Sequence, residues 1–280
     1  MHDEDGTGEP VNGAASGMNL FGPEQVEQLA ALQLRLLGAE PSGDGTQAHA
    51  VSSFGPFEVG IHLVLPNKVS SSSFVLPGPE RGGAIGLFKC SGRGLAPAFQ
   101  SQDLAARFFE RFKANAGARE LKAFVEERND ALLERGLPGR FAMLGLGVIS
   151  QAGEAAWLSA GGPDAYLYHE ATKSCRKLKL VSGPPLGMMP SMMVEMQGGW
   201  KAFKLPLERG DLVFFPSGDW DEAGIPTIID AALARTRSEG GHAPLPSILA
   251  EVLAGLQKAA ESVDGFETLG DRFVAALRKN

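Results

Sequence analysis

The sequence predicts an α+β fold in which two antiparallel sheets form a sandwich and helices cover its outer faces. From Phe54 onward, short β-type runs alternate with Gly, Pro and Ser residues. Two helix-type segments stand between the early and middle runs, and two more stand before the last run. No internal repeat or linker divides this part of the chain. The strands and helices are therefore expected to build one domain.

Two segments precede this domain. Residues 1–22 are rich in Gly, Asp, Glu and Ser, a composition that predicts disorder. Pro23 lies where a helix would begin and Gly38 where it would end, which predicts a leading helix over 23–38. Its apolar stripe either packs on the chain's own domain or joins two copies as a homodimer through Glu24–Leu37. Both interpretations remain open.

The domain proper is expected to cover residues 39–280. Its β-branched and aromatic runs predict strands, and its longer segments with helical spacing predict helices. The expected strands are Phe57–Leu65, Ser73–Leu76, Ala84–Cys90, Ala142–Ser150, Ala155–Ala160, Ala165–His169, Lys177–Val181, Met192–Met196, Trp200–Leu205, Leu212–Phe215 and Arg272–Leu277. The expected helices are Asp103–Ala114, Glu120–Arg135, Pro226–Arg237 and Pro246–Ser262.

Composition excludes several classes of function. The 280 residues are 44% apolar and carry a formal charge of −7, which gives no electrostatic footprint for nucleic acid and disfavours anionic membranes. No apolar run approaches the roughly 18 residues that a membrane span needs. The two cysteines, Cys90 and Cys175, have no metal-type spacing. These features predict a reduced, cytoplasmic protein.

Chemistry-bearing residues gather in residues 210–223, which read Gly-Asp-Leu-Val-Phe-Phe-Pro-Ser-Gly-Asp-Trp-Asp-Glu-Ala. An apolar strand followed by an acidic turn is a pattern suited to a metal site at a strand end. The acids of this turn, together with the acid before the last strand, form a candidate cluster: Asp219, Asp221, Glu222 and Asp271. Asp211 is expected to serve the tight turn into the strand.

Two other segments have alternative interpretations. The loop of Ser91, Gly92, Arg93 and Gly94 either binds an anion on its main-chain amides or needs glycine only for its conformation. A methionine-rich segment, which includes Met188 and continues to Met196, either offers adaptable apolar surface to a protein partner or belongs to the core.

Several motifs in register resemble the SpoIIE/RsbU branch of the metal-dependent (type 2C, PPM) protein serine/threonine phosphatases. They begin with Leu-Gln-Leu-Arg-Leu-Leu at the end of the leading helix and continue in the family's order. The resemblance covers the chain from about residue 24 to its end. It implies the α-β-β-α sandwich of that family. The remaining motifs are Gly55–His62, Phe88–Ala98, Leu158–Gly162, Gly183–Gly187, Gly210–Ala223 and Leu269–Phe273.

The resemblance also implies metal-dependent phosphatase chemistry, but this chain lacks the aspartates that the chemistry needs. Enzymes of the family bind paired Mn or Mg ions through aspartates, and the metals activate the water that attacks phosphorus. The four aspartate positions correspond here to His62, Lys89, Gly218 and Gly270. None is a carboxylate. We therefore expect no catalytic residues, no metal and no cofactor. The Lys89 ammonium either replaces a cation by pairing with a remaining acid, Asp219 or Asp271, or turns outward into solvent.

The function that follows is that of a pseudophosphatase in bacterial signalling. Active relatives dephosphorylate small proteins of the STAS type, so a STAS-type or other phosphoprotein is the expected partner. The alternative is a divergent Mn- or Mg-dependent phosphatase that uses the displaced acids Asp219, Asp221 and Asp271. A structural subunit that assembles through its leading helix is a third hypothesis.

Overall fold

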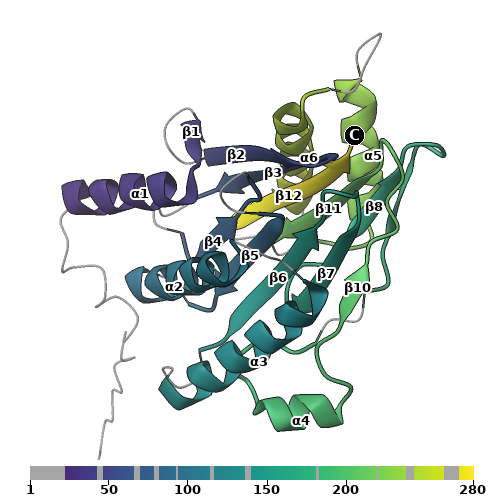
Figure 1. Ribbon diagram of the computed structural model, residues 1–280. Coiled ribbons are helices and arrows are strands. Elements are labelled where there is room, and N and C mark those ends of the chain that lie inside the picture. The colour runs from purple at the N-terminus through teal and green to yellow at the C-terminus, as the bar shows by residue number, and fades with distance from the viewer. Residues whose placement is uncertain are drawn as a thin grey trace, which may run out of the picture.

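The computed structural model describes residues 23–42, 47–65, 70–78, 82–92, 94–113, 117–135, 140–180, 183–218, 220–237, 243–261 and 271–280. These residues form two antiparallel sheets stacked face to face (Figure 1). The fold is thus the two-sheet α+β sandwich that the sequence predicts. The residues expected to be disordered, 1–22, lie outside the described ranges, as do Arg93, Asp219 and Gly270.

The larger sheet has seven strands in the order β1-β2-β3-β12-β11-β8-β9. The last strand of the chain lies at its centre, between β3 and β11, so the two ends of the folded domain are joined by hydrogen bonds. Its strands are β1 (Glu40–Ser42), β2 (Gln47–Phe54), β3 (Phe57–Val64), β8 (Tyr166–His169), β9 (Ser174–Lys177), β11 (Leu212–Ser217) and β12 (Arg272–Lys279).

The smaller sheet has five strands in the order β10-β7-β6-β5-β4, again with antiparallel pairing. Its strands are β4 (Ser72–Val75), β5 (Ala84–Cys90), β6 (Ala142–Ile149), β7 (Ala155–Ala160) and β10 (Ala202–Lys204). β4 and β10 form the two edges of this sheet.

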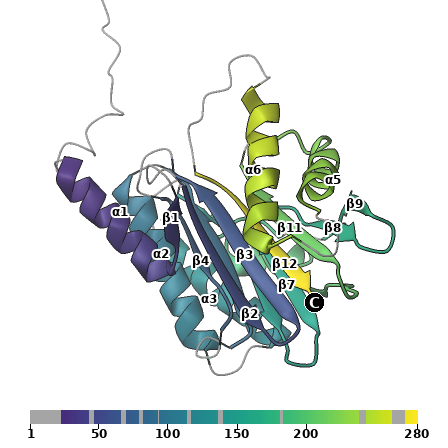
Figure 2. The ribbon, with the colours of Figure 1, turned by 90° about the horizontal axis from the view of Figure 1, so that it is seen from above.

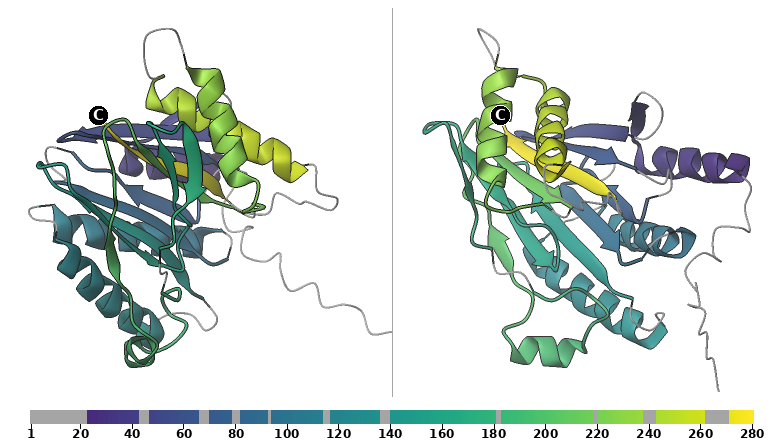
Figure 3. Two further views of the ribbon diagram at one scale, coloured as in Figure 1. Left: turned by 90° about the vertical axis from the view of Figure 1, so that its right-hand side faces the viewer. Right: turned by 180° about the vertical axis from the view of Figure 1, so that it is seen from behind.

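Helices cover the outer face of each sheet, as Figure 3 shows in side view. α5 (Ile225–Thr236) and α6 (Leu245–Glu261) pack on the larger sheet, and α2 (Leu95–Phe112) and α3 (Ala118–Arg135) pack on the smaller one. A short helix, α4 (Ser191–Met196), packs against α3. Across the described residues, no helix combines the length and apolarity that crossing a bilayer requires.

The space between the sheets is filled by the side chains that alternate along each strand. On β3, the inward residues Phe57, Val59, Ile61 and Leu63 belong to this core. At its centre the Trp157 ring of the smaller sheet stacks on a phenylalanine of the larger sheet, Phe215, with ring centroids 3.9 Å apart. The residues between the inward ones face the helices instead. This alternation decides which side chains can reach a site between the sheets.

The leading helix α1 (Pro23–Leu37) lies beside the sheet edges and α2, as the view from above shows (Figure 2). Its inner face packs through Leu34 and Leu37. The buried amide of Gln33 fixes it further, because Nε2 donates to the main-chain oxygen of Ser70 at 2.7 Å and Oε1 accepts from the Ser70 amide at 2.9 Å. The helix is therefore docked on its own domain, while Leu32 on its outer face remains 52% exposed.

Two strands of the larger sheet were not predicted from the sequence. β1 and β2 are poor in the β-branched and aromatic residues that indicate strands. Pairing of β2 with β3 along their whole length, from Gln47 opposite Val64 to Phe54 opposite Phe57, holds it in place. Tertiary pairing, which local propensity does not report, accounts for this difference.

The strand predicted at Met192–Met196 is wrong, because these residues lie in α4. Unbranched methionine favours helices, Pro190 precedes the first turn, and Gly198 and Gly199 with positive φ follow the last one.

Two other elements begin three or more residues earlier than the sequence predicts. α2 starts at Leu95 rather than Asp103, since its proline, Pro97, stands in the first turn, where a missing N–H costs nothing. β9 is Ser174–Lys177 rather than Lys177–Val181, because the hairpin with β8 turns at Lys173, which has a φ of 56°.

The docking of α1 gives a first prediction. Replacement of Gln33 by alanine leaves the buried N–H and C=O of Ser70 without their partners, which should cost about 1–3 kcal/mol of stability. Arg35→Ala, on the exposed face of the same helix, should cost under ~0.5 kcal/mol. Urea unfolding of both variants measures the difference, and equal midpoints would show that the amide does not anchor the helix.

Candidate functional site

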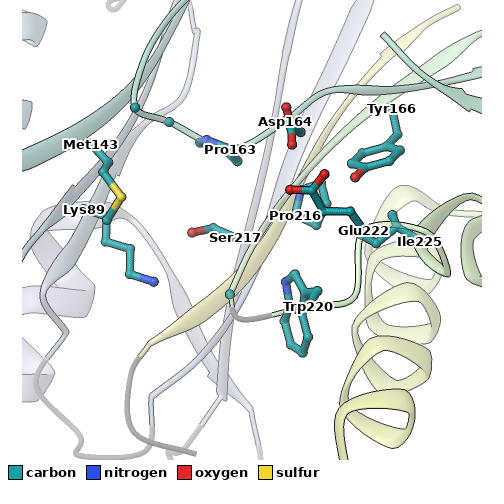
Figure 4. A pocket seen from close by; sticks show the side chains of 13 residues that line it. Lys89, Met143, Pro163, Asp164, Tyr166, Pro216, Ser217, Trp220, Glu222 and Ile225 are labelled. Atoms are coloured by element: carbon teal, nitrogen blue, oxygen red, sulfur yellow. The ribbon is translucent and has the colours of Figure 1, made fainter. Parts of the chain in front are cut away.

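A cavity of about 250 Å³ opens where corresponding ends of the two sheets meet (Figure 4). Lys89 of β5 and Met143 of β6 line it from the smaller sheet, and the end of β11 with the following turn lines it from the larger one. Two of the four degenerate positions, Lys89 and Gly218, therefore lie together. The full lining is Lys89, Met143, Gly161, Gly162, Pro163, Asp164, Tyr166, Pro216, Ser217, Gly218, Trp220, Glu222 and Ile225.

Lys89 stands near the end of β5, on the side of the strand that carries the inward residues Ile85 and Leu87. Its Nζ donates to the main-chain oxygen of Asp271 at 3.2 Å. This hydrogen bond joins Lys89 to the main chain of Asp271. The other expected partner, Asp219, lies outside the described residues.

The carboxylate of Asp271 accepts hydrogen bonds from the segment that precedes β4 of the smaller sheet. Its Oδ2 accepts hydrogen bonds from Ser70 Oγ at 2.9 Å, from the Ser71 amide at 2.5 Å and from Ser71 Oγ at 2.8 Å. Asp271 is 4% exposed, so these bonds satisfy an ion that water hardly reaches. The acid before the last strand therefore joins the two sheets rather than facing the cavity as a free ligand.

Gly218 lies directly beneath an aromatic ring. A Cβ atom at this position would stand 2.5 Å from Cε2 of Trp220, well inside van der Waals contact. The guanidinium of the buried Arg272 lies over the indole, with its Cζ 4.9 Å from the ring centroid, and helps to hold it there. An aspartate at 218 would have to displace Trp220 before it could bind a metal.

His62 does not join the other degenerate positions. It follows the inward Ile61 on β3, so its side chain faces the helix-covered side, as does Val274 opposite it on β12. Its Nε2 lies 3.1 Å from Gln47 Oε1, and burial, with a smaller effect of His49, lowers the pKa of its imidazole. The His62 side chain therefore lies on the helix-covered face of the larger sheet and not in the cavity.

The acids after β11 serve the turn and the surface. The Asp221 carboxylate accepts a hydrogen bond from the Ala223 amide at 3.2 Å, within the turn before α5. Glu222 Oε2 is 2.5 Å from Lys177 Nζ, which also binds Asp164 Oδ2 at 2.7 Å. Its hydrogen bond to Lys177 lowers the pKa of Glu222. Glu222 reaches the cavity wall, but its charge is already paired with an ammonium.

Asp211 has the structural role that the sequence predicts for it. It is 1% exposed at the start of β11 and accepts hydrogen bonds from the amides of Glu170 and Glu208, both at 2.9 Å. Its carboxylate also lies 2.7 Å from His169 Nδ1, and this hydrogen bond raises the pKa of the imidazole.

The predicted anion-binding loop has a conformation that requires glycine. Gly92 and Gly94 have φ angles of 99° and 85°, in the region that other residues rarely adopt. Ser91 is bonded to Phe141 through both its main-chain N–H and its hydroxyl oxygen. The described part of the loop thus supports the conformational interpretation, and Arg93 lies outside it.

Sequence reasoning missed three polar residues of the cavity wall: Asp164, Tyr166 and Ser217. Tyr166 is 1% exposed, and its hydroxyl has no hydrogen-bond partner among the described residues. Burial raises its pKa to about 12, so it is a neutral donor at pH 7. Tyr166 sits in β8 within an apolar run, where it resembles an ordinary core tyrosine. Its place in the cavity wall depends on the pairing of β8 with β11, which the sequence does not show.

These described residues do not fit a divalent cation. Such an ion needs several carboxylate or other oxygen ligands around one point. The cavity offers an ammonium at Lys89 and an indole over Gly218, while its two carboxylates at Asp164 and Glu222 are held by Lys177. No group of three or more His, Cys, Asp or Glu side chains within the described ranges is arranged to hold a metal.

Comparison with known proteins gives the family. The model of "Stage II sporulation protein E (SpoIIE)" matches residues 80–264, well over half of the chain. A search among curated proteins found no match.

Solved structures share the fold at low identity. RsbX in complex with magnesium has a TM-score of 0.57 at 12% identity, with 83% of this chain and 100% of that chain covered. The SiaA PP2C domain of Pseudomonas aeruginosa has a TM-score of 0.55 at 16% identity, and the match covers 92% of this chain and 96% of that chain. The PP2C phosphatase domain of SpoIIE from Bacillus subtilis, solved with a fragment of its regulatory domain, has a TM-score of 0.51 at 13% identity. The match covers 86% of this chain and 61% of that chain. Together the family match and the shared sandwich place this chain in the SpoIIE family, within the PPM-type phosphatase fold.

Proposed function

We propose that this protein is a non-catalytic member of its family, a pseudophosphatase that binds a protein partner in bacterial signalling. One observation carries the proposal: Lys89 and Gly218, which the resemblance assigns to two metal-ligand positions, line one cavity, and Trp220 covers Gly218.

The loss of these ligands affects the catalyst directly. In the metal-dependent mechanism the nucleophile is a water molecule activated by the cations, and no side chain replaces it. An ammonium at position 89 repels a divalent cation, and the carboxylate of Asp271, whose main-chain oxygen accepts from Lys89, is bound by Ser70 and Ser71. Each change weakens a metal centre, and together they leave none of the described residues suited to activate water.

Exposed apolar surface supports a binding role. The methionines of α4 and the segment before it are unusually accessible: Met188 is 57% exposed, Met192 74% and Met196 82%. Flexible methionines suit surfaces that adapt to a partner. We propose a STAS-type or other phosphoprotein as that partner. We also propose that a second copy of this chain binds to the outer face of α1 around Leu32.

Metal binding and turnover test the proposal most simply. Calorimetric titration of the purified chain with Mn and Mg should give no stoichiometric binding, and hydrolysis of an aryl phosphate should not depend on added metal. The displaced-carboxylate alternative predicts the opposite, with one or two ions bound and turnover that Asp221→Asn and Glu222→Gln abolish. That outcome would overturn the pseudophosphatase proposal.

The indole over Gly218 gives a second test. Gly218→Asp should destabilise the fold by about 1–3 kcal/mol, because the new side chain collides with Trp220. Gly224→Asp is the matched control, since a Cβ there meets its nearest atom at 3.7 Å and an aspartate at this N-cap position favours α5. In the double variant Gly218→Asp/Trp220→Ala, the destabilisation caused by the contact between the aspartate and the indole should disappear. If thermal melts of Gly218→Asp matched those of Gly224→Asp, Trp220 would not occupy the ligand's place.

A further inference from the structure

We propose that the surface formed by α4, the segment before it and the adjoining side of α3 binds a basic amphipathic helix of a partner protein. This inference rests on the proposed binding role and deepens it, because it names the element of the partner that the surface recognises. The apolar side chains of this surface, which we call the methionine surface, are Leu133, Met188, Met192, Met193 and Met196.

The exposed apolar residues of the protein are concentrated here. Among the described residues, eight large apolar side chains are exposed, and five of the eight belong to the methionine surface. The most exposed are Met196 at 82% and Met192 at 74%, whereas Val194 on the inner side of α4 is buried. Single exposed apolar residues are ordinary on soluble proteins, but a contiguous group is typical of a surface that another molecule covers.

Hydrogen bonds and an ion pair hold the methionine surface along α3. The buried Asn129 of α3 donates from Nδ2 to Ser191 Oγ at 2.9 Å and accepts through Oδ1 from the Gly187 amide at 2.8 Å. Seven residues earlier on α3, Lys122 Nζ lies 2.9 Å from Glu195 Oε2 at the other end of α4. The segment that carries the methionines therefore runs antiparallel to α3, and the two helices lie side by side (Figure 1).

The methionine surface has the length of a short helix. At about 1.5 Å per residue, the part of α3 from Lys122 to Leu133 spans about 17 Å, or roughly three helical turns. Met188, Met192 and Met196 follow one another at steps of four residues beside it. An amphipathic helix presents its apolar residues at i, i+3, i+4 and i+7 over a similar distance. Unbranched, flexible methionines adapt their shape to such a face.

The charges of α3 beside Leu133 favour a basic helix. Lys122, Glu126, Asp130 and Glu134 follow one another at steps of four residues, so they form one row on the side of α3 that adjoins α4. Lys122 pairs with Glu126 as well as with α4. Among the described residues, no ion pair involves Asp130 or Glu134. Two carboxylates at the edge of the apolar surface are thus available to lysine or arginine side chains of a partner.

The cations nearest to Leu133 point away from this edge. Arg135 follows Leu133 by two residues, which correspond to about 200° of rotation around α3, so it projects from the opposite side of the helix. Arg140 is directed to the loop after β5, because a Cβ atom at Gly92 would lie 3.2 Å from its Nη1. Arg93 of the same loop lies outside the described residues.

Other cations lie at the far end of the methionine surface. Arg119 stands in the first turn of α3, about 21 Å along the helix from Leu133. Lys201 follows α4, and its Nζ would lie 3.9 Å from a Cβ atom at Gly198. The surface therefore has an acidic end beside Leu133 and a mixed end beside Lys122. A partner helix is expected to place its basic residues at the acidic end.

Methionine methyl groups supply the measurement. The probe is an acetylated, amidated peptide of leucine and lysine with helical spacing, added to the full chain labelled with ¹³C in its methionine methyl groups. It should shift the signals of Met192 and Met196 saturably and leave that of Met143, in the cavity, unchanged. A leucine–glutamate peptide of the same pattern should bind at least tenfold more weakly. So should a leucine–lysine peptide in which the two residues alternate.

Substitutions test the two parts of the surface separately, with affinity measured by anisotropy of the labelled peptide. Met192→Gln/Met196→Gln should weaken binding at least tenfold, and Phe99→Gln, which replaces a side chain 62% exposed on α2, should not change it. Glu134→Lys should weaken binding severalfold at low salt. Glu261→Lys makes the same charge change at the exposed end of α6 and should leave the affinity unchanged.

The outcomes separate this inference from the proposal beneath it. Unchanged methyl signals of Met192 and Met196, equal binding of the leucine–glutamate peptide, or equal affinities of the methionine and Phe99 variants would each overturn helix binding. Signals that move with protein concentration alone would assign the surface to a second copy of this chain, and equal shifts with phosphatidylcholine vesicles would assign it to a membrane. Broadening of the Met143 signal by Mn would instead overturn the non-catalytic function.

Discussion

The carboxylate of Asp271 organises the end of the sandwich where the cavity opens. It precedes β12, the central strand of the larger sheet, and it binds Ser70 and Ser71, which lead into the edge strand β4 of the smaller sheet. The main chain of the same Ser70 is bonded to Gln33 of α1, and the main-chain oxygen of Asp271 accepts a hydrogen bond from Lys89. One buried anion thus connects both sheets, the leading helix and the cavity wall.

This arrangement agrees with the proposed loss of the metal centre. In a metal-dependent sandwich, cations between the sheets would offset the repulsion of clustered carboxylates. Here the acid that remains is neutralised locally by hydroxyl and amide donors, and an ammonium lies beside its main chain. The indole of Trp220, held by Arg272, fills the space next to Gly218. Hydrogen bonds of Asp271 and Lys89 and the packing of Trp220 thus stabilise this end of the sandwich.

Most of the fold could be predicted from the sequence, because its long strands and helices have clear periodicity and turn residues. α5 and α6 begin within one residue of the predicted bounds. β1 and β2 could not be predicted, since pairing with neighbours rather than side-chain type makes them strands. The methionines of α4 misled the prediction because an apolar run of five residues fits either a strand or a helix.

The site was predicted unevenly for a related reason. The motifs single out Lys89 and Gly218 at well-marked strand ends, and both residues line one cavity. They did not reveal that His62 faces the helices, which depends on the pleat of β3, or that Trp220 covers Gly218, which depends on the turn after β11. Tyr166 and Asp164 carry no motif at all. Their importance comes from burial and pairing, which the linear sequence does not contain.

The central claim is that this end of the sandwich no longer holds metal. The most direct measurement is anomalous diffraction from crystals grown in excess Mn. We expect no Mn peak in the cavity, with Lys89 Nζ still bonded to the main-chain oxygen of Asp271. A peak about 2 Å from carboxylate oxygens of the β11–α5 turn, a distance typical of hard divalent cations, would contradict the account.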